Sequence, residues 1–315
     1  MDLAELECYD SLFIAPHGDD VMLACPARLL GEAEKGRRVL VLALFEPVGG
    51  GKNAPQVARD LGADYVAAGL LTAGERWDGR SVLAGTGDRP PEDEDTLAEA
   101  AVLLAEVGAR SRAIHVYAPL GLGFSVDHSL TYESAVRAFA TEAGRNLFLY
   151  EERPEAFVPG AVRTRLALLG VRLPPGAARS ADRSGLVRHL WRVNEPARLR
   201  GDARGIRARL AALGAARRRL RLARPWNPLR AFGPRLQPVV HSADEEAMLR
   251  ARAVAEGVLP KDGRGRSRSA RLFNARATAA AKKLGGVYHA ERLWLFLPSG
   301  DGLPEVQHPL ERAAY

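Results

Sequence analysis

Short apolar runs alternate with helix-like segments through the first half of this 315-residue chain. Each run has the length of a strand and is bounded by polar residues, glycine or proline, as buried strands are. The expected strands lie at 11–15, 38–45, 64–68, 113–118 and 147–150, with a later one at 287–297. The expected helices lie between strands, at 23–35, 56–61 and 96–107. This βαβ rhythm predicts an α/β fold with a doubly wound, mostly parallel sheet and helices on both faces.

The rhythm stops after the fifth expected strand, where an arginine-rich segment begins. Residues 161–240 hold 19 arginines, no lysine and three acids, a net charge of +16, whereas the whole chain carries +7. We therefore expect a basic inserted or cap region at 159–272, and a main domain made of 1–158 and 273–315. Apolar residues at spacings of four and three predict a helix over 199–213. Such a segment is typical of a solvated face, but it also suits contact with nucleic acid, an anionic membrane or a phosphorylated substrate.

The cysteine content and the absence of targeting signals indicate a cytoplasmic protein. Cys8 and Cys25 are too few for a disulfide framework and have no CxxC spacing, which favours a reducing compartment. The first thirty residues show no basic leader with an apolar core, and no window reaches 18 uninterrupted apolar residues. No RNP-like, helix-turn-helix or KH signature accompanies the arginines, so nucleic acid is a disfavoured partner. Peripheral contact with an anionic membrane and the oligomeric state stay open.

The motif HGDD, which begins at His17, stands where the first expected strand ends. Ligands of parallel α/β sheets bind outside the carboxyl ends of the strands. Histidine and aspartate suit Zn²⁺ or another divalent ion, and His17 and Asp20 can converge on one ion from a single turn. A second pair, Asp127 and His128, follows the expected strand at 113–118. Loops at one sheet edge can thus join His17, Asp20 and His128 in a three-ligand catalytic metal site.

The adjacent acid Asp19 is the candidate general base. It would be free to take a proton from a metal-bound water, whose pKa the ion lowers toward neutrality. A structural alternative is that His17 and the acids cap the following helix and bind backbone N–H groups. Two histidines and one carboxylate also form the facial triad of non-haem iron oxygenases, so the identity of the metal stays open.

These motifs resemble those of the PIG-L or LmbE-like N-deacetylases. PHGDD followed by VMLACPARLL is similar to their PHPDDE motif, and VDH after a strand ending in AP is similar to their HxDH motif. The resemblance extends to LGADYVAAGL, to LYE at 149–151 and to the closing HAERLW, which begins at His289. It covers roughly residues 9–158 and 270–297 and leaves the arginine-rich segment uncovered.

The resemblance implies a Rossmann-like fold and a reaction. It makes His17, Asp20 and His128 the ligands of Zn²⁺ and Asp19 the general base, in agreement with the assignment from the residues themselves. The implied reaction is hydrolysis of an N-acetyl group on an N-acetylglucosamine-type sugar or sugar conjugate. Metal-bound water would attack the amide carbonyl, and Asp19 would accept its proton and pass it to the departing amine.

Three residues depart from the family motifs. Gly18 replaces a proline, which we expect to loosen the turn, and Val21 replaces a glutamate that could orient a ligand. Ser125 replaces the first histidine of HxDH, which in the family helps to stabilise the oxyanion. Losing one such donor costs about a hundredfold or more in rate. A second hypothesis therefore stays open, a catalytically impaired relative that binds metal or sugar without turnover.

Four further residues are candidates for orienting a ligand or contacting substrate. Asp127 would hold His128 or a substrate hydroxyl, and Ser125 could donate a hydrogen bond in place of the missing histidine. Asp78 lies in a loop where the family often has a sugar-contacting acid, although an aspartate that forms a turn is an equal alternative. His289 precedes the AE pair of the closing motif and is a candidate to face the site, with a core or surface histidine as its alternative interpretation.

Overall fold

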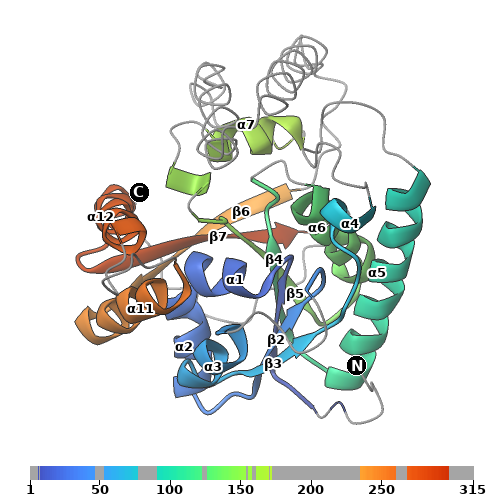
Figure 1. Ribbon diagram of the computed structural model, residues 1–315, viewed down its shortest axis with the longest axis horizontal. Helices are drawn as coiled ribbons and strands as arrows, with labels where there is room; N and C mark the ends of the chain where they lie inside the picture. Colours follow the sequence, from blue (N-terminus) through green and yellow to red (C-terminus); the bar gives the residue numbers. More distant parts are fainter. Residues whose placement is uncertain are drawn as a thin grey trace.

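The fold is a seven-stranded sheet with helices on both faces (Figure 1). The computed structural model describes residues 6, 8–46, 53–76, 91–122, 126–153, 155–157, 161–169, 171, 235–259 and 268–297. Its strands are β1 Ser11–Ala15, β2 Val39–Ala43, β3 Asp64–Ala67, β4 His115–Pro119, β5 Asn146–Tyr150, β6 Arg235–Ala243 and β7 His289–Leu297. They follow the order β3-β2-β1-β4-β5-β7-β6. Strands β1 to β5 are parallel, whereas β7 runs antiparallel to β5 and to β6. The predicted fold class is confirmed.

The central strands are apolar on both faces because helices cover both. Every residue of β1 and β2 is buried. Since side chains alternate along a strand, Leu12 and Ile14 of β1 belong to the hydrophobic cluster on one face, and Phe13 and Ala15 to the cluster on the other. A continuous apolar run is what a parallel strand needs when both of its faces are covered.

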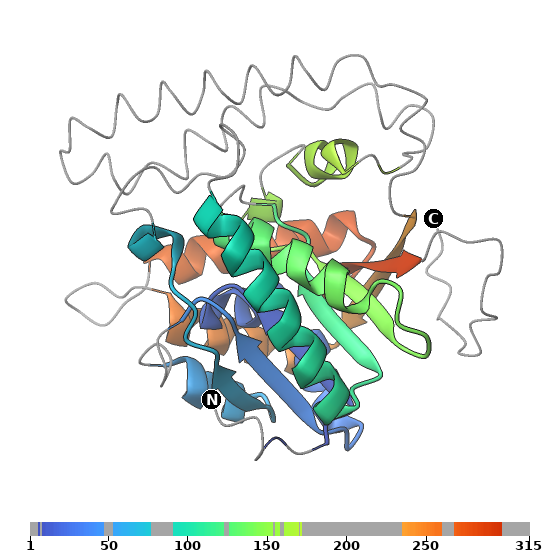
Figure 2. The ribbon, with the colours of Figure 1, turned by 90° about the vertical axis from the view of Figure 1, so that its right-hand side faces the viewer.

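The helices divide between the two faces of the sheet. They are α1 Gly18–Ala24, α2 Pro26–Glu34, α3 Ala54–Asp60, α4 Ala73–Arg76, α5 Pro91–Ser111, α6 Val126–Phe139, α7 Ala161–Leu168, α11 Glu245–Val258 and α12 Arg268–Lys283, with the short 3₁₀ helix η2 Glu155–Phe157. Helices α5 and α6 pack together on one face (Figure 2), while α1, α2, α3 and α11 share the cluster on the other. The single helix expected at 23–35 is two helices. Pro26 has no N–H with which to continue α1, and it is the first residue of α2.

Part of the expected insertion belongs to the main sheet. Strand β6 pairs along its length with β7, and α11 packs against α2. Pro238 obscured this strand in the sequence, but β6 is at the edge of the sheet, where proline is tolerated. The expected helix at 199–213 lies outside the described residues. Within the described part of the chain, no helix combines the length and apolar character needed to cross a membrane.

Candidate metal centre

The HGDD motif forms the N-cap and the first turn of α1. His17 is the N-cap residue with extended backbone (φ −126°, ψ 158°), and Gly18 begins the helix. The Asp20 carboxylate accepts a hydrogen bond from the His17 backbone N–H, with a distance of 3.0 Å between Oδ2 and N. The capping role that the sequence allowed is therefore present. It does not compete with metal binding, because it fixes the position of the Asp20 carboxylate beside the His17 ring.

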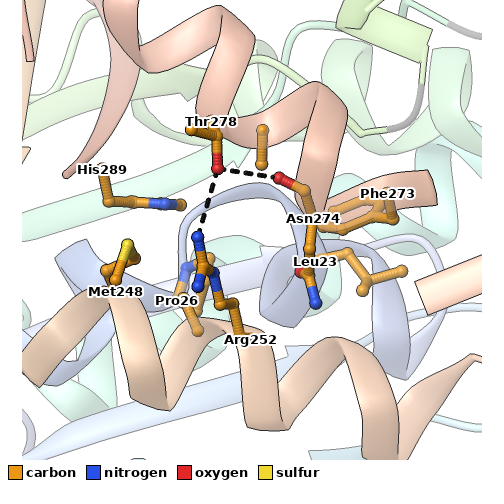
Figure 3. Close-up of a pocket in the computed structure, with 10 residues that line it drawn as sticks. Leu23, Pro26, Met248, Arg252, Phe273, Asn274, Thr278 and His289 are labelled. Atoms are coloured by element: carbon orange, nitrogen blue, oxygen red, sulfur yellow. Dashed lines mark hydrogen bonds between the residues drawn. The ribbon is translucent and has the colours of Figure 1, made fainter. Parts of the chain in front are cut away.

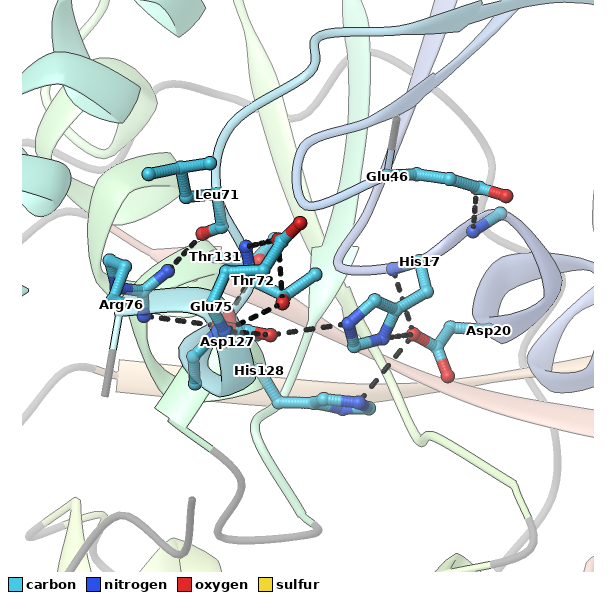
Figure 4. A network of polar contacts seen from close by, with 12 residues as sticks. His17, Asp20, Glu46, Leu71, Thr72, Glu75, Arg76, Asp127, His128 and Thr131 are labelled. Atoms are coloured by element: carbon cyan, nitrogen blue, oxygen red, sulfur yellow. Dashed lines mark hydrogen bonds and ion pairs between the residues drawn. The ribbon is translucent and has the colours of Figure 1, made fainter. Parts of the chain in front are cut away.

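Helix α6 brings His128 to the same place from the end of β4. The donor atoms of His17, Asp20 and His128 all lie within 4.8 Å of one another. The Asp20 Oδ2 atom lies 3.2 Å from His17 Nδ1 and 3.5 Å from His128 Nε2 (Figure 4). A tetrahedral zinc ion with ligand bonds of about 2.0–2.1 Å holds neighbouring donor atoms about 3.4 Å apart. Asp20 Oδ2 lies at about this distance from one nitrogen of each imidazole, so this group could hold a divalent ion.

Each imidazole is held on its outer nitrogen by a different carboxylate. His17 Nε2 lies 3.2 Å from Asp127 Oδ2, and His128 Nδ1 lies 3.3 Å from Glu152 Oε1. A carboxylate that accepts the N–H on one nitrogen leaves the lone pair of the other nitrogen for a metal. Nδ1 of His17 and Nε2 of His128 are thus the nitrogens that face Asp20. Asp127 contacts His17 rather than His128, which corrects the predicted partner.

Asp127 is itself fixed by α4. Its Oδ1 atom accepts hydrogen bonds from the Ala73 backbone N–H at 2.9 Å and from Arg76 Nη2 at 3.0 Å. The Arg76 guanidinium also pairs with Asp93 Oδ1 at 3.0 Å and lies over the Phe45 ring. Asp127, Asp93 and Arg76 are all buried, so the ion pairs are screened little by solvent. These contacts occupy the Asp127 carboxylate and support it as a positioning group for His17.

The carboxylates of the site stabilise positive charge. Burial by itself would lower the pKa of His17, but the hydrogen bonds with Asp127 and Asp20 more than offset it and raise that pKa to about 10. For His128, burial is likewise outweighed by the charge of Asp20 and the contact with Glu152, and its pKa rises to about 9. The pKa of Asp20 is lowered, since the two histidines outweigh its burial. The group therefore favours a cation, either protons on the imidazoles or a metal ion in their place.

Asp19 follows Gly18 in the first turn of α1 and is not one of the three converging donors. It is exposed to solvent, although nearby protein atoms limit its hydration. This partial desolvation, and next the charge of Asp20, raise the pKa of Asp19 above its ordinary value. A carboxylate close to the metal ligands but outside the ligand set can move a proton. Its role as general base stays a prediction.

The remaining predicted residues lie elsewhere or outside the described part. Ser125 and Asp78 are outside the described residues. His289 Nε2 lies 3.0 Å from Glu291 Oε1, and the Glu291 carboxylate accepts hydrogen bonds from two backbone N–H groups at the start of α2. His289 also lines a hollow between α11 and α12, close to Met248 and across from Phe273 (Figure 3). His289 is buried and has a hydrogen-bonding partner, which fits the core histidine of the two alternatives, core or surface.

Sequence reasoning missed Glu152 and Arg76. Glu152 is the second residue after β5, as His17 is the second residue after β1, so its position at the carboxyl end of a parallel strand was a usable signal. Its carboxylate also accepts a hydrogen bond of 2.8 Å from the Leu122 backbone N–H. Arg76 carried no comparable signal, because its partners Asp93 and Asp127 are distant in the sequence.

Replacing Glu152 by glutamine should weaken metal binding by about tenfold to a hundredfold, the usual effect of losing a partner of a metal-bound histidine. The amide does not carry the charge that holds the His128 N–H. Glu151→Gln is the matched control, because Glu151 contacts Arg292 and Trp294 rather than a histidine. Dissociation constants for Zn²⁺ and Co²⁺ check this prediction. Equal affinities for the two variants would show that Glu152 does not position His128.

Comparison with known proteins shows a match in structure. No family model and no curated protein matches the chain. A deacetylase of the teicoplanin biosynthesis pathway, solved as a complex with bog, is 19% identical with a TM-score of 0.59, covering 93% of this chain and 99% of that one. The zinc-inhibited form of teicoplanin deacetylase Orf2 is 18% identical with a TM-score of 0.57, with 93% and 99% covered. The A40926 pseudoaglycone deacetylase Dbv21 is 17% identical with a TM-score of 0.54, with 94% and 100% covered. The resemblance found in the sequence is thus confirmed at the level of the fold: the chain has the Rossmann-like α/β fold of the LmbE-like deacetylases.

Proposed function

We propose that this protein is a metal-dependent amide hydrolase that removes an N-acetyl group from an N-acetylglucosamine-type sugar or sugar conjugate. The observation that carries the proposal is the convergence of His17, Asp20 and His128, with a carboxylate on the outer nitrogen of each imidazole. Open three-ligand sites of this composition are typical of hydrolytic metal centres. The shared fold with deacetylases supports the reaction class, and a matching deacetylase–teicoplanin complex supports a sugar conjugate as substrate.

In this proposal, His17, Asp20 and His128 would hold the ion, with His17 Nδ1 and His128 Nε2 as the nitrogens that face the Asp20 carboxylate. When bound, a divalent ion supplies Lewis-acid polarisation of a carbonyl and lowers the pKa of a water molecule. Asp19 takes one proton from the attacking water as the new C–O bond forms. The same carboxylic acid then gives that proton to the amide nitrogen as the C–N bond breaks, and acetate and the free amine leave. Asp127 and Glu152 keep the two imidazoles in the required tautomers.

The metal is proposed as Zn²⁺ or another divalent ion. One of the matching structures is the zinc-inhibited form of teicoplanin deacetylase Orf2. Binding and activation are therefore separate measurements for this chain. Activity should be compared after loading with Zn²⁺, Co²⁺, Ni²⁺ or Fe²⁺ at one equivalent and at excess.

The test of the proposal is metal content together with acetate release. Protein purified without chelator should hold about one divalent ion per chain. It should release acetate from an N-acetylglucosamine conjugate, lose this activity on dialysis against a chelator and regain it with one equivalent of metal. Protein that holds no divalent metal, or acetate release that a chelator does not affect, would contradict the proposal. Stoichiometric metal without acetate release from any amino-sugar conjugate would favour the catalytically impaired relative.

A further inference from the structure

Gly18 is enclosed by the side chains of Glu46, which lies beyond β2, and of Tyr65 in β3. Its backbone N–H donates a hydrogen bond of 2.7 Å to Glu46 Oε2, and the Tyr65 hydroxyl donates one of 2.5 Å to the same oxygen. A Cβ atom at position 18 would lie 2.8 Å from Ala54 Cβ and closer still to the Tyr65 and Glu46 oxygens. No side chain fits there without moving these groups. Glycine is therefore required at this position for steric reasons.

Backbone hydrogen bonds beyond the end of β2 place Glu46 beside Gly18. Beyond the end of β2, Leu44 and Phe45 donate backbone hydrogen bonds of 2.9 Å each to Ala15 and Pro16, so the two chain segments stay side by side past the strands. Glu46 is the next residue and is 9% exposed. Its carboxylate lies at the N-terminus of α1, where helix N–H groups have no partner within the helix and negative charge is favourable.

The hydrogen bond to Glu46 gives Gly18 a different role from the one expected from the sequence. We expected glycine to loosen the turn in place of the motif's proline. A proline has no N–H to donate, so the bond to Glu46 exists only because the residue is not proline. The Gly18 N–H belongs to the peptide that follows His17, and holding it fixes the ψ angle of His17 at the observed 158°. In this chain the hydrogen bond from Gly18 to Glu46 restrains the turn, whereas in the family motif the proline ring restrains it.

We propose that Glu46, supported by Tyr65, is a positioning residue of the metal centre. Its carboxylate fixes the Gly18 peptide, and that peptide sets the direction in which His17 and Asp20 present their donor atoms. This inference rests on the proposed function, since it concerns the metal ligands of that site. It adds Glu46, which lies beyond the end of β2 and outside both motifs.

Titration of the full-length protein with Co²⁺, followed by its visible d–d spectrum, tests the inference without a substrate. Glu46→Ala should weaken Co²⁺ binding by about tenfold to a hundredfold and alter the spectrum, because the ligands lose their common orientation. Glu46→Gln keeps an acceptor oxygen for the Gly18 N–H and should recover most of the affinity. Tyr65→Phe should show a smaller loss than Glu46→Ala. Tyr9→Phe is the matched control, since its hydroxyl donates a similar 2.9 Å bond to Asp64, away from HGDD.

Far-UV circular dichroism and thermal unfolding show which variants are folded. If Glu46→Ala does not fold, Tyr65→Phe carries the test, because it removes one hydroxyl and adds no volume. Wild-type Co²⁺ affinity and an unchanged spectrum in the folded Glu46 and Tyr65 variants would overturn the inference and leave the proposed function intact. A wild-type protein that binds no Co²⁺, Zn²⁺, Ni²⁺ or Fe²⁺ would overturn both.

Discussion

Asp19→Asn is expected to lower the rate of N-deacetylation by about 10²- to 10⁴-fold, the usual contribution of a general base, while metal binding stays close to wild type. The amide has nearly the shape of the carboxylate but cannot accept the proton of water. Asp19 is outside the group of converging donors, so its loss removes no ligand. Initial rates of acetate release and metal content per chain, measured on the same sample, check both halves of the prediction.

Two further variants show whether a lower deacetylation rate comes from loss of the general base or from loss of the metal. Asp20→Asn should lose metal and activity together, because Asp20 is one of the three donors. Asp60→Asn changes an exposed acid on α3 and should leave both unchanged. A wild-type rate in metal-loaded Asp19→Asn would assign proton transfer to another group. Loss of metal in that variant would instead make Asp19 part of the binding site.

The parts of the fold that the sequence predicted are those with a local cause. Strands β1 and β2 are buried along their whole length because helices cover both faces of the sheet, and this burial requires the apolar runs that the sequence shows. The meeting of HGDD with VDH followed from the same logic, since parallel strands bring their carboxyl ends to one edge. Strand β6 and helix α6 were missed because local signals contradict them: Pro238 interrupts one, and a serine- and threonine-rich run begins the other.

The partners within the site could not be predicted from sequence adjacency. Asp127 stands beside His128, which suggested that the two interact. Both lie in α6, where successive side chains diverge by about 100° and do not face each other. Asp127 therefore contacts His17, and His128 is held by Glu152 from the end of β5. Such pairings depend on how α6 sits on the sheet, and no spacing in the sequence encodes that.

The affinity for a divalent ion is expected to rise with pH by up to about 100-fold per unit between pH 6 and 8, because each bound ion displaces two protons. In the protein alone, the pKa of His17 is raised to about 10 and that of His128 to about 9. Both values lie above this range, so both imidazoles carry a proton that must leave before nitrogen can bind metal. Asp20, whose pKa is lowered, is ionised throughout and adds no pH dependence.

Competition titrations against a chromophoric chelator, corrected for protonation of the chelator, give the slope of log K against pH. Calorimetry in two buffers of different ionisation enthalpy counts the released protons independently. Asp127→Asn removes the charged partner of the His17 N–H, so the slope should fall toward one, whereas the exposed-site variant Glu106→Gln should keep it near two. A slope near zero in the wild-type protein would mean that both imidazoles are already neutral at pH 6. In that case the carboxylates around them do not hold positive charge in the way that the geometry of the site requires.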